Sequence, residues 1–371
     1  MRPDKLFQSS GIVGIIASSY ITGCTPDSAK LPTRVNTNDT GDTSNIVYDS
    51  GGLDDTGNDL VSPADQGQLL AISDNGLDFT VYNEAFIKNA GTPDFCYTTS
   101  GTPCLTDDNL LIASFVYFPN KGSDSDKGYI SLAYIGIEDG DYTVSDISIV
   151  QTENLPEANK TADLRPIDPD LHQLSDGSYM LFFSYDDEKA RTPRLHYATT
   201  EDLNQPFQYG GATEFASPDP EETEDYYIRV LDPALIYIKS ENKWHLYVSA
   251  EQSIFNPETE ETSWPNHHYV TSSDLDPELI ESEGATNMNL TGIIDSELRM
   301  QGNPFINEEV MRFYGCNGVG DSTSATSTDN GYTWEMDDGV RVEGGGDTAV
   351  ATLQGKYILM TTYFPDAPDI P

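Results

Sequence analysis

The chain has 371 residues, of which 62 are acidic and 19 are lysine or arginine, so its formal net charge is -43. A surface with this excess of negative charge repels nucleic acid and anionic lipid, which excludes a nucleic-acid-binding function. We attribute the charge to solubility in a saline habitat or to screening by divalent ions rather than to a specific acidic partner.

The first 23 residues are predicted to be an export signal. Arg2 and Lys5 precede an apolar run at 11–21 that is too short to span a bilayer as a helix. The run ends in Ile-Thr-Gly-Cys at 21–24, which resembles the bacterial lipobox. That resemblance implies that Cys24 is lipidated and anchors the chain to the cell envelope, and Thr25 after it implies the outer membrane. The alternative is an ordinary secretory signal in which Cys24 has no role.

Residues 24–67 are rich in Asp, Gly, Thr, Asn and Ser and contain few large apolar side chains. Such a composition cannot bury a core, so we expect a disordered acidic tether. Residues 68–371 are then one domain.

Two copies of one pattern organise this domain, at 165–185 (RPIDPDLHQLSDGSYMLFFSY) and at 229–251 (RVLDPALIYIKSENKWHLYVSAE). In each copy an Arg stands three residues before Asp-Pro, and a polar turn separates two apolar runs. Proline has no N–H for a ladder, so Asp-Pro predicts a strand start, and the turn predicts a hairpin. Looser copies occur at 301–318 and 346–364.

The repeats predict an all-β fold, a five-bladed β-propeller of four-stranded antiparallel blades. The first blade runs from Asp94 to about Val150, and the others begin at residues 165, 229, 301 and 346. The last blade has only two strands before the chain ends, so residues 69–82 are expected to complete it and close the ring. A β-sandwich with a second domain is the structural alternative.

Short motifs resemble those of known propellers. Ser327 to Trp334 (STDNGYTW) matches the Asp-box S-x-D-x-G-x-T-W of sialidases and other propellers, and SDNGLDF at 73–79 is a degraded copy. The Asp-Pro strand starts followed by DGSYMLFF or NKWHLYVS resemble five-bladed glycoside hydrolases of the arabinanase, xylosidase and invertase type. An Asp-box is a folding element that also occurs in propellers without activity, so these motifs imply the fold more than the chemistry.

Polar residues at the five predicted strand starts should meet at the propeller axis. They are Asp94, Asp168, Asp232, Asn303 and Asp347. Glycoside hydrolysis needs a protonated acid and an ionised base or nucleophile, and crowded carboxyl groups provide both. The alternative is that these aspartates only cap the turns at strand starts.

The resemblance assigns roles by blade. It implies that Asp94 is the base and that Asp168 sets the pKa of the acid, while Asp232 stands where the family has a glutamic acid. Asn303 and Asp347 are expected to bind substrate.

The repeated arginines Arg165 and Arg229 could bind a carboxylate in bidentate fashion. Sialidases use three arginines in this way, and Arg312 or Arg341 would be the third. The alternative is a repeated Arg–Asp ion pair within each blade.

Cysteine and histidine positions indicate structural roles. Cys96 and Cys104 bracket a short loop that a disulfide would close in an exported protein, which leaves Cys316 as an unpaired, buried residue. The histidines show no spacing typical of a metal site, so neither a metal nor a cofactor is predicted.

These features predict a cell-surface glycoside hydrolase, in monomeric form, that acts on a polysaccharide or glycoconjugate. The alternatives are a non-catalytic propeller that binds carbohydrate or protein and a sialidase-like enzyme on acidic sugars.

Overall fold

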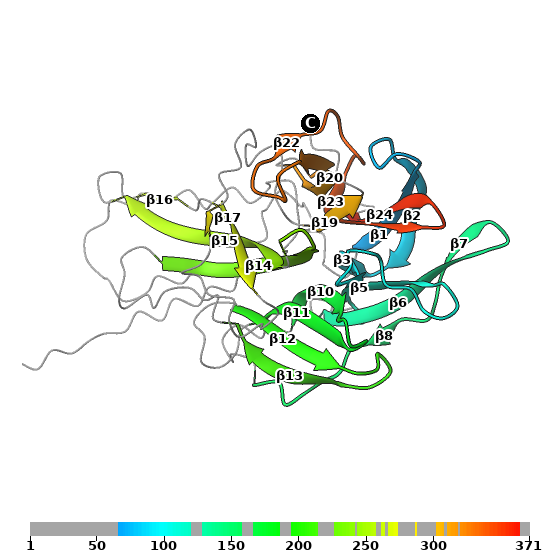
Figure 1. The fold of residues 1–371 in the computed structure, drawn as a ribbon, viewed down its shortest axis with the longest axis horizontal. Helices are drawn as coiled ribbons and strands as arrows, with labels where there is room; N and C mark the ends of the chain where they lie inside the picture. The colour runs from blue at the N-terminus through cyan, green and yellow to red at the C-terminus, as the bar shows by residue number, and fades with distance from the viewer. Residues whose placement is uncertain are drawn as a thin grey trace, which may run out of the picture.

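The computed structural model describes residues 66–119, 128–157, 166–185, 194–213, 226–241, 243–256, 261–263, 266–273, 286–287, 302–307, 310–317 and 320–363 (Figure 1). Every helix or strand assigned within these ranges is a β-strand, so this part of the chain is all-β. The same ranges contain no helix with the length and apolarity of a membrane span. The predicted signal peptide, Cys24 and nearly all of the predicted tether lie outside them.

The described strands form five sheets, each named here after its innermost strand. The β3 sheet contains β3 (Ala90–Phe95), β5 (Leu111–Tyr117), β6 (Tyr129–Glu138), β7 (Asp141–Val144) and β8 (Ser148–Ile149). The β10 sheet contains β10 (Ile167–Gln173), β11 (Tyr179–Tyr185), β12 (Arg194–Thr200) and β13 (Phe207–Ala212), with β4 (Tyr97–Thr98) and β9 (Thr152–Glu153) at its edges. The β14 sheet contains β14 (Tyr226–Ile238), β15 (Lys243–Asn256), β16 (Glu261–Ser263), β17 (Asn266–Ser273) and β18 (Thr286–Asn287).

The last two sheets come from the end of the chain. The β19 sheet contains β19 (Pro304–Asn307), β20 (Val310–Cys316), β21 (Ser322–Ser327) and β22 (Glu335–Met336). The β23 sheet contains β23 (Gly345–Leu353) and β24 (Lys356–Tyr363), together with β1 (Gly67–Ser73) and β2 (Thr80–Lys88). Strand β1 pairs antiparallel with β24 over its whole length. The prediction that residues 69–82 complete the sheet of the C-terminal strands is therefore confirmed.

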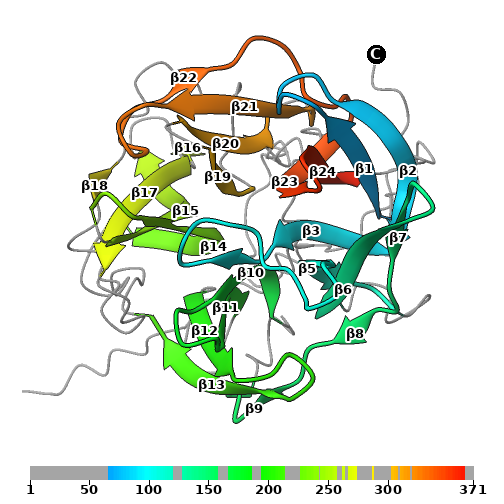
Figure 2. The same cartoon turned by 45° about the vertical axis from the view of Figure 1, so that its right-hand side comes forward.

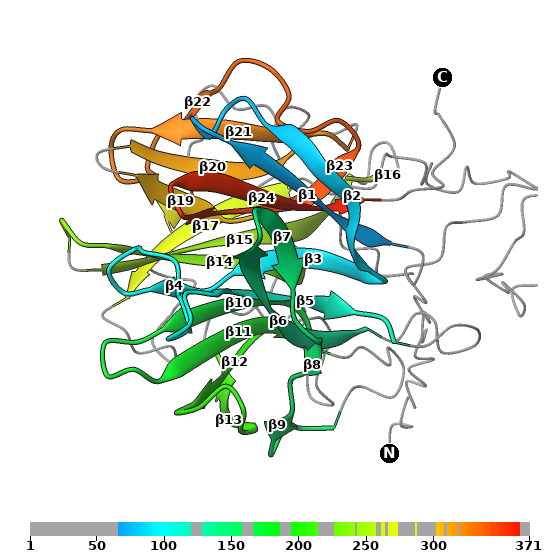
Figure 3. The ribbon, with the colours of Figure 1, turned by 90° about the vertical axis from the view of Figure 1, so that its right-hand side faces the viewer.

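The middle strands of the sheets are buried on both faces because each sheet packs against two others. Strands β5 and β11, for example, are buried along nearly their whole length. Four side-chain clusters join the sheets in the order β23, β3, β10, β14 and β19, and the cluster of β23 also includes Phe305 and Tyr314 of the β19 sheet. Figure 2 shows the five innermost strands gathered around the middle of the molecule, and Figure 3 shows β3, β10 and β14 running across the view. The contacts between sheets thus follow a circular order.

The Asp-Pro pairs lie at bulges rather than always at strand starts. In β10 the bulge falls between Ile167 and Asp170, so Asp168 and Pro169 lie close to the strand start. In β14 the bulge falls between Leu231 and Ala234, well after the strand begins at Tyr226. The expected strand start is therefore wrong for the second copy. A bulge tolerates proline because the extra residue leaves the hydrogen-bonded ladder.

The turn at 327–334 is held by its aspartate. Asp329 Oδ1 accepts hydrogen bonds from the amides of Tyr332 (3.1 Å) and Thr333 (2.8 Å). Trp334 donates to the Gly331 carbonyl at 3.0 Å and packs against Tyr247 of the β14 sheet. This turn therefore stabilises the contact between two neighbouring sheets.

Cys96 and Cys104 form a disulfide with an S–S distance of 2.10 Å, the pairing that their short loop predicts. Cys316 is also disulfide-bonded, so the expectation of an unpaired thiol is wrong. Its side chain is fully buried, which is the part of the expectation that holds.

Lipidation of Cys24 stays a prediction. A thioether-linked lipid and a disulfide exclude one another at a single sulfur, so peptide mass spectrometry of the mature chain without reduction distinguishes the two states. We expect an acylated N-terminal Cys24 and a Cys96–Cys104 crosslink. A peptide in which Cys24 is joined to Cys316 would contradict the lipid anchor.

Candidate carboxylate site

Four aspartates from four sheets line one small cavity of about 30 Å³ near the ends of the innermost strands. They are Asp94 (β3), Asp168 (β10), Asp232 (β14) and Asp347 (β23). Each of the four is less than a tenth exposed. The structure therefore brings together the four carboxylates that the repeats place at strand starts.

Three residues around this cavity have a strained backbone. Thr92, Asp168 and Asp232 have φ values of 42°, 52° and 51°, in the left-handed region, and each precedes a proline at a bulge. Such a conformation costs on the order of 1–3 kcal/mol per residue and is a clear outlier for β-branched threonine. Strain of this kind, repeated in three sheets and aimed at one cavity, indicates a functional constraint.

The positive φ values also show which positions are equivalent in the three sheets. Thr92, and not Asp94, occupies the position that Asp168 and Asp232 occupy in their own sheets. Asp94 follows its proline and is equivalent to Asp170.

Asp94 and Asp170 each accept a backbone hydrogen bond from the next sheet. Asp94 Oδ2 accepts from the Leu171 amide at 3.0 Å, and Asp170 Oδ2 accepts from the Leu235 amide at 2.7 Å. We call these two contacts the aspartate latches. Because both carboxyl groups are buried, each latch holds one innermost strand against the next and so sets the spacing of the cavity aspartates.

Asn303 makes the equivalent contact between the β19 and β23 sheets. Its Oδ1 accepts from the Val350 amide at 3.1 Å, while its Nδ2 donates to Asp94 Oδ1 at 3.2 Å. The side chain expected to bind substrate is thus buried and engaged on both of its polar atoms. Asn303 fixes Asp94 in place from the opposite side to Leu171.

Burial is the main influence on the pKa of Asp94. It raises the pKa of Asp94 well above the ordinary value of 3.8, and the nearby charge of Asp170 raises it further. The hydrogen bonds from Leu171, Phe95 and Asn303 oppose this shift. Both oxygens of Asp94 are engaged, Oδ2 by the Leu171 amide and Oδ1 by Asn303 Nδ2, which favours a positioning role for this residue.

This shift predicts a pH-dependent stability. A carboxyl whose pKa is higher in the folded chain binds its proton more tightly there than in the unfolded chain. Its contribution to the stability of the fold is therefore fully present below about pH 4 and is lost as the pH rises through the folded-state pKa. We expect the Asp94→Asn variant to lose less stability between pH 4 and pH 7 than the Asp108→Asn variant, which removes one exposed charge. Denaturant melts at both pH values measure this, and identical pH dependence in the two variants would contradict it.

At Gly302, which lines the cavity, the backbones of the β19 and β23 sheets lie close together. A Cβ at Gly302 would lie 2.1 Å from the Tyr314 carbonyl oxygen and 2.4 Å from that of Thr348. Any side chain would push the β19 and β23 sheets apart.

Of the four predicted arginines, only Arg312 and Arg341 have described side chains. Arg165 lies outside the described residues, and Arg229 is described only as a backbone position in β14. Arg312 donates to Asp337 at 2.8 Å, and Arg341 donates to the Leu77 carbonyl at 2.8 Å. Neither Arg312 nor Arg341 lines the cavity, so they do not complete an arginine triad there.

Sequence reasoning missed Thr92, Asp170 and Gly302. Aligning Thr-Pro at 92–93 with the two Asp-Pro pairs would have found Thr92. Nothing in the sequence separates the role of Asp170 from that of Asp168. Among the described residues there is no cluster of three or more His, Cys, Asp or Glu side chains arranged to hold a metal ion.

No protein-family model and no curated protein matches the chain. Among solved structures, it aligns with a β-xylosidase at 14% identity, covering 75% of this chain and 94% of that one, with a TM-score of 0.47. A GH43_1 enzyme from Xanthomonas citri aligns at 13% identity over 74% of this chain and 87% of that one, with a TM-score of 0.47.

An α-L-arabinofuranosidase from Clostridium thermocellum aligns at 10% identity, over 71% of this chain and 80% of that one, with a TM-score of 0.42. Identities and TM-scores at this level carry no argument about the activity of this chain. Its function is therefore inferred from the carboxylate site itself.

Proposed function

We propose that the five sheets are the blades of a five-bladed propeller closed by β1 and β24, and that the chain is a cell-surface glycoside hydrolase. The circular order of sheet contacts and the pairing of β1 with β24 support the propeller. The observation that supports the hydrolase is the convergence of aspartates from different sheets on one cavity, two of them in strained backbone.

Three of these aspartates have roles in the proposed reaction. Asp232 donates a proton to the leaving oxygen, and the charge of Asp168 raises the pKa of Asp232 so that it holds this proton. Asp347 accepts a proton from the attacking water. Asp94, the base that the resemblance implies, has the latch contacts described above and takes a positioning role instead.

A second candidate function is glycan binding without catalysis. Thr92 favours it, because this residue holds the position of Asp168 and Asp232 but has no carboxyl group. Loss of one reacting group would prevent catalysis and leave the other polar groups of the site in place. In either case we expect a carbohydrate ligand and attachment to the envelope through Cys24.

A glycan panel tests the proposal. The purified chain is incubated with neutral and acidic polysaccharides, and new reducing ends are measured over several hours. The hydrolase proposal predicts release from at least one glycan. Binding to a glycan without release from any member of the panel would favour the binding function. Release from acidic glycans alone would favour the sialidase-like alternative.

A further inference from the structure

A second, much larger pocket of about 810 Å³ lies at the other end of the innermost strands. Along β14 it is lined by Tyr237, five residues after Asp232, and along β23 by Thr352, five residues after Asp347. Five residues of strand span about 16 Å, so the two sites are separate. The volume lies in the range of small-molecule sites, roughly 300–1,000 Å³.

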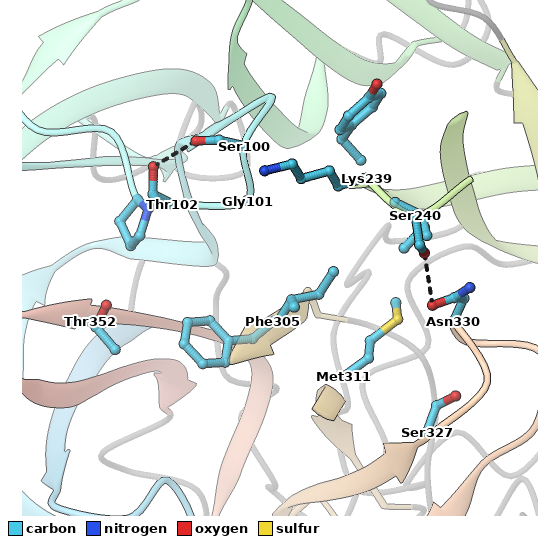
Figure 4. A pocket seen from close by; sticks show the side chains of 14 residues that line it. Ser100, Gly101, Thr102, Lys239, Ser240, Phe305, Met311, Ser327, Asn330 and Thr352 are labelled. Carbon is cyan, nitrogen blue, oxygen red and sulfur yellow. Dashed lines mark hydrogen bonds between the residues drawn. The ribbon is translucent and has the colours of Figure 1, made fainter. Parts of the chain in front are cut away.

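The lining of this pocket contrasts with the charge of the chain. Among the described residues that line it there is no Asp or Glu, although the sequence has 62 acidic residues. Lys239 is the one charged side chain in that set. Figure 4 shows Lys239 extending from the β14–β15 turn across the pocket toward Gly101. No described residue forms an ion pair with it.

The uncharged part of the lining has two kinds of surface. Hydroxyl groups come from Ser100, Thr102, Ser240, Ser327 and Thr352 (Figure 4). Apolar surface comes from Phe305, Ile306 and Met311. A hydroxyl has one donor and two acceptor sites. Ser240 makes one contact and Ser100 and Thr102 make two each, so these three keep capacity for a ligand, whereas Ser327 uses all three sites within its own turn. Hydroxyls beside apolar surface match a sugar ring, which has polar edges and C–H faces.

Hydrogen bonds hold the walls of the pocket in place. Asn330 Oδ1 accepts from Ser240 at 3.4 Å, and Asn330 Nδ2 donates to Glu241 at 2.7 Å, which joins the turns of the β14 and β19 sheets. Thr102 and Ser100 share a hydrogen bond of 3.2 Å across the facing loop. A site with fixed walls loses little freedom when it binds a ligand.

We propose that this pocket binds a small sugar acid, with its carboxylate at Lys239 and its hydroxyls at the serine and threonine rim. The site is distinct from the carboxylate cavity and does not depend on hydrolysis. The described lining residues include no Asp or Glu, so this pocket repels an anionic sugar less than the carboxylate cavity with its four aspartates does, although Glu241 bonds the lining residue Asn330.

Calorimetric titration with D-glucuronic acid, D-glucose and acetate tests this proposal. We expect saturable binding of glucuronic acid to the wild type and weaker binding of both glucose and acetate. Lys239→Gln should weaken glucuronic acid binding at least 10-fold and leave glucose binding unchanged. Lys88→Gln, which removes an exposed lysine of β2 outside the pocket, should have no effect.

Two further variants separate the pocket from the carboxylate site. Ser240→Trp should abolish glucuronic acid binding because the indole occupies the pocket, whereas Asp168→Asn should retain it. The proposal is overturned if the wild type shows no saturable binding, if Lys239→Gln binds as tightly as the wild type, or if acetate binds as tightly as glucuronic acid. Loss of binding in Asp168→Asn would place the ligand at the carboxylate cavity and also overturn it. Thermal melts of every variant establish that it is folded.

Discussion

Replacing Asp168 or Asp232 by asparagine is expected to lower turnover at least 100-fold. Each change removes a titratable group at nearly constant volume, and general acid–base catalysis contributes roughly 10²–10⁴ in rate. In Asp232→Asn the proton donor is lost. In Asp168→Asn the charge that we propose raises the pKa of Asp232 is lost. Initial rates of reducing-end release on the best glycan of the panel measure both effects.

Asp176→Asn is the matched control for this pair. Asp176 lies on the exposed turn that follows β10, in the same sheet as Asp168, and its carboxylate accepts hydrogen bonds from the amide and the hydroxyl of Ser178. Its replacement should leave turnover within a factor of two. If Asp168→Asn and Asp232→Asn lose stability in a thermal melt but keep full turnover, the two aspartates only cap strands and the catalytic assignment fails.

Replacing Asp170 by alanine is expected to lower the free energy of unfolding by about 2–5 kcal/mol. The carboxyl is buried and bonds two groups, the Leu235 amide and His172 Nε2, each at 2.7 Å. Alanine leaves both without this partner, and a buried unsatisfied polar group costs roughly 1–3 kcal/mol. Urea denaturation measures the loss.

The Asp170→Asn variant tests the hydrogen bonds of Asp170 separately from its negative charge. Its amide oxygen can still accept from Leu235 and its amide nitrogen can donate to His172, so we expect a loss of about 1 kcal/mol or less. The latch also sets the distance between β10 and β14, so turnover should fall further in the alanine variant than in the asparagine variant. Equal stability of the two variants would show that the Leu235 contact does not hold the strands together.

Much of the fold could be predicted from the sequence because apolar runs and polar turns alternate along the chain and the hairpin units repeat. The hairpins after residues 165 and 229 and the pairing of the first strands with the last ones follow from apolar runs and turns alone. Such local or periodic patterns can be recognised in a single sequence.

The register at the cavity could not be predicted in the same way. In a regular strand Asp168 and Asp170 would point to the same face, because side chains alternate with a period of two. The bulge inserts a residue between them, so Asp168 lines the cavity while Asp170 bonds the next sheet. An equivalent bulge in β3 puts Thr92 where Asp94 was expected.

The most direct test measures binding and hydrolysis of one glycan by the same wild-type sample. A labelled oligosaccharide chosen from the panel is titrated into the full chain, and bound ligand and new reducing ends are followed together. We expect saturable binding followed by release of reducing ends, and the Asp168→Asn/Asp232→Asn double variant should bind with unchanged affinity and release none. Binding by the wild type with no release above the rate of the double variant would contradict the hydrolase.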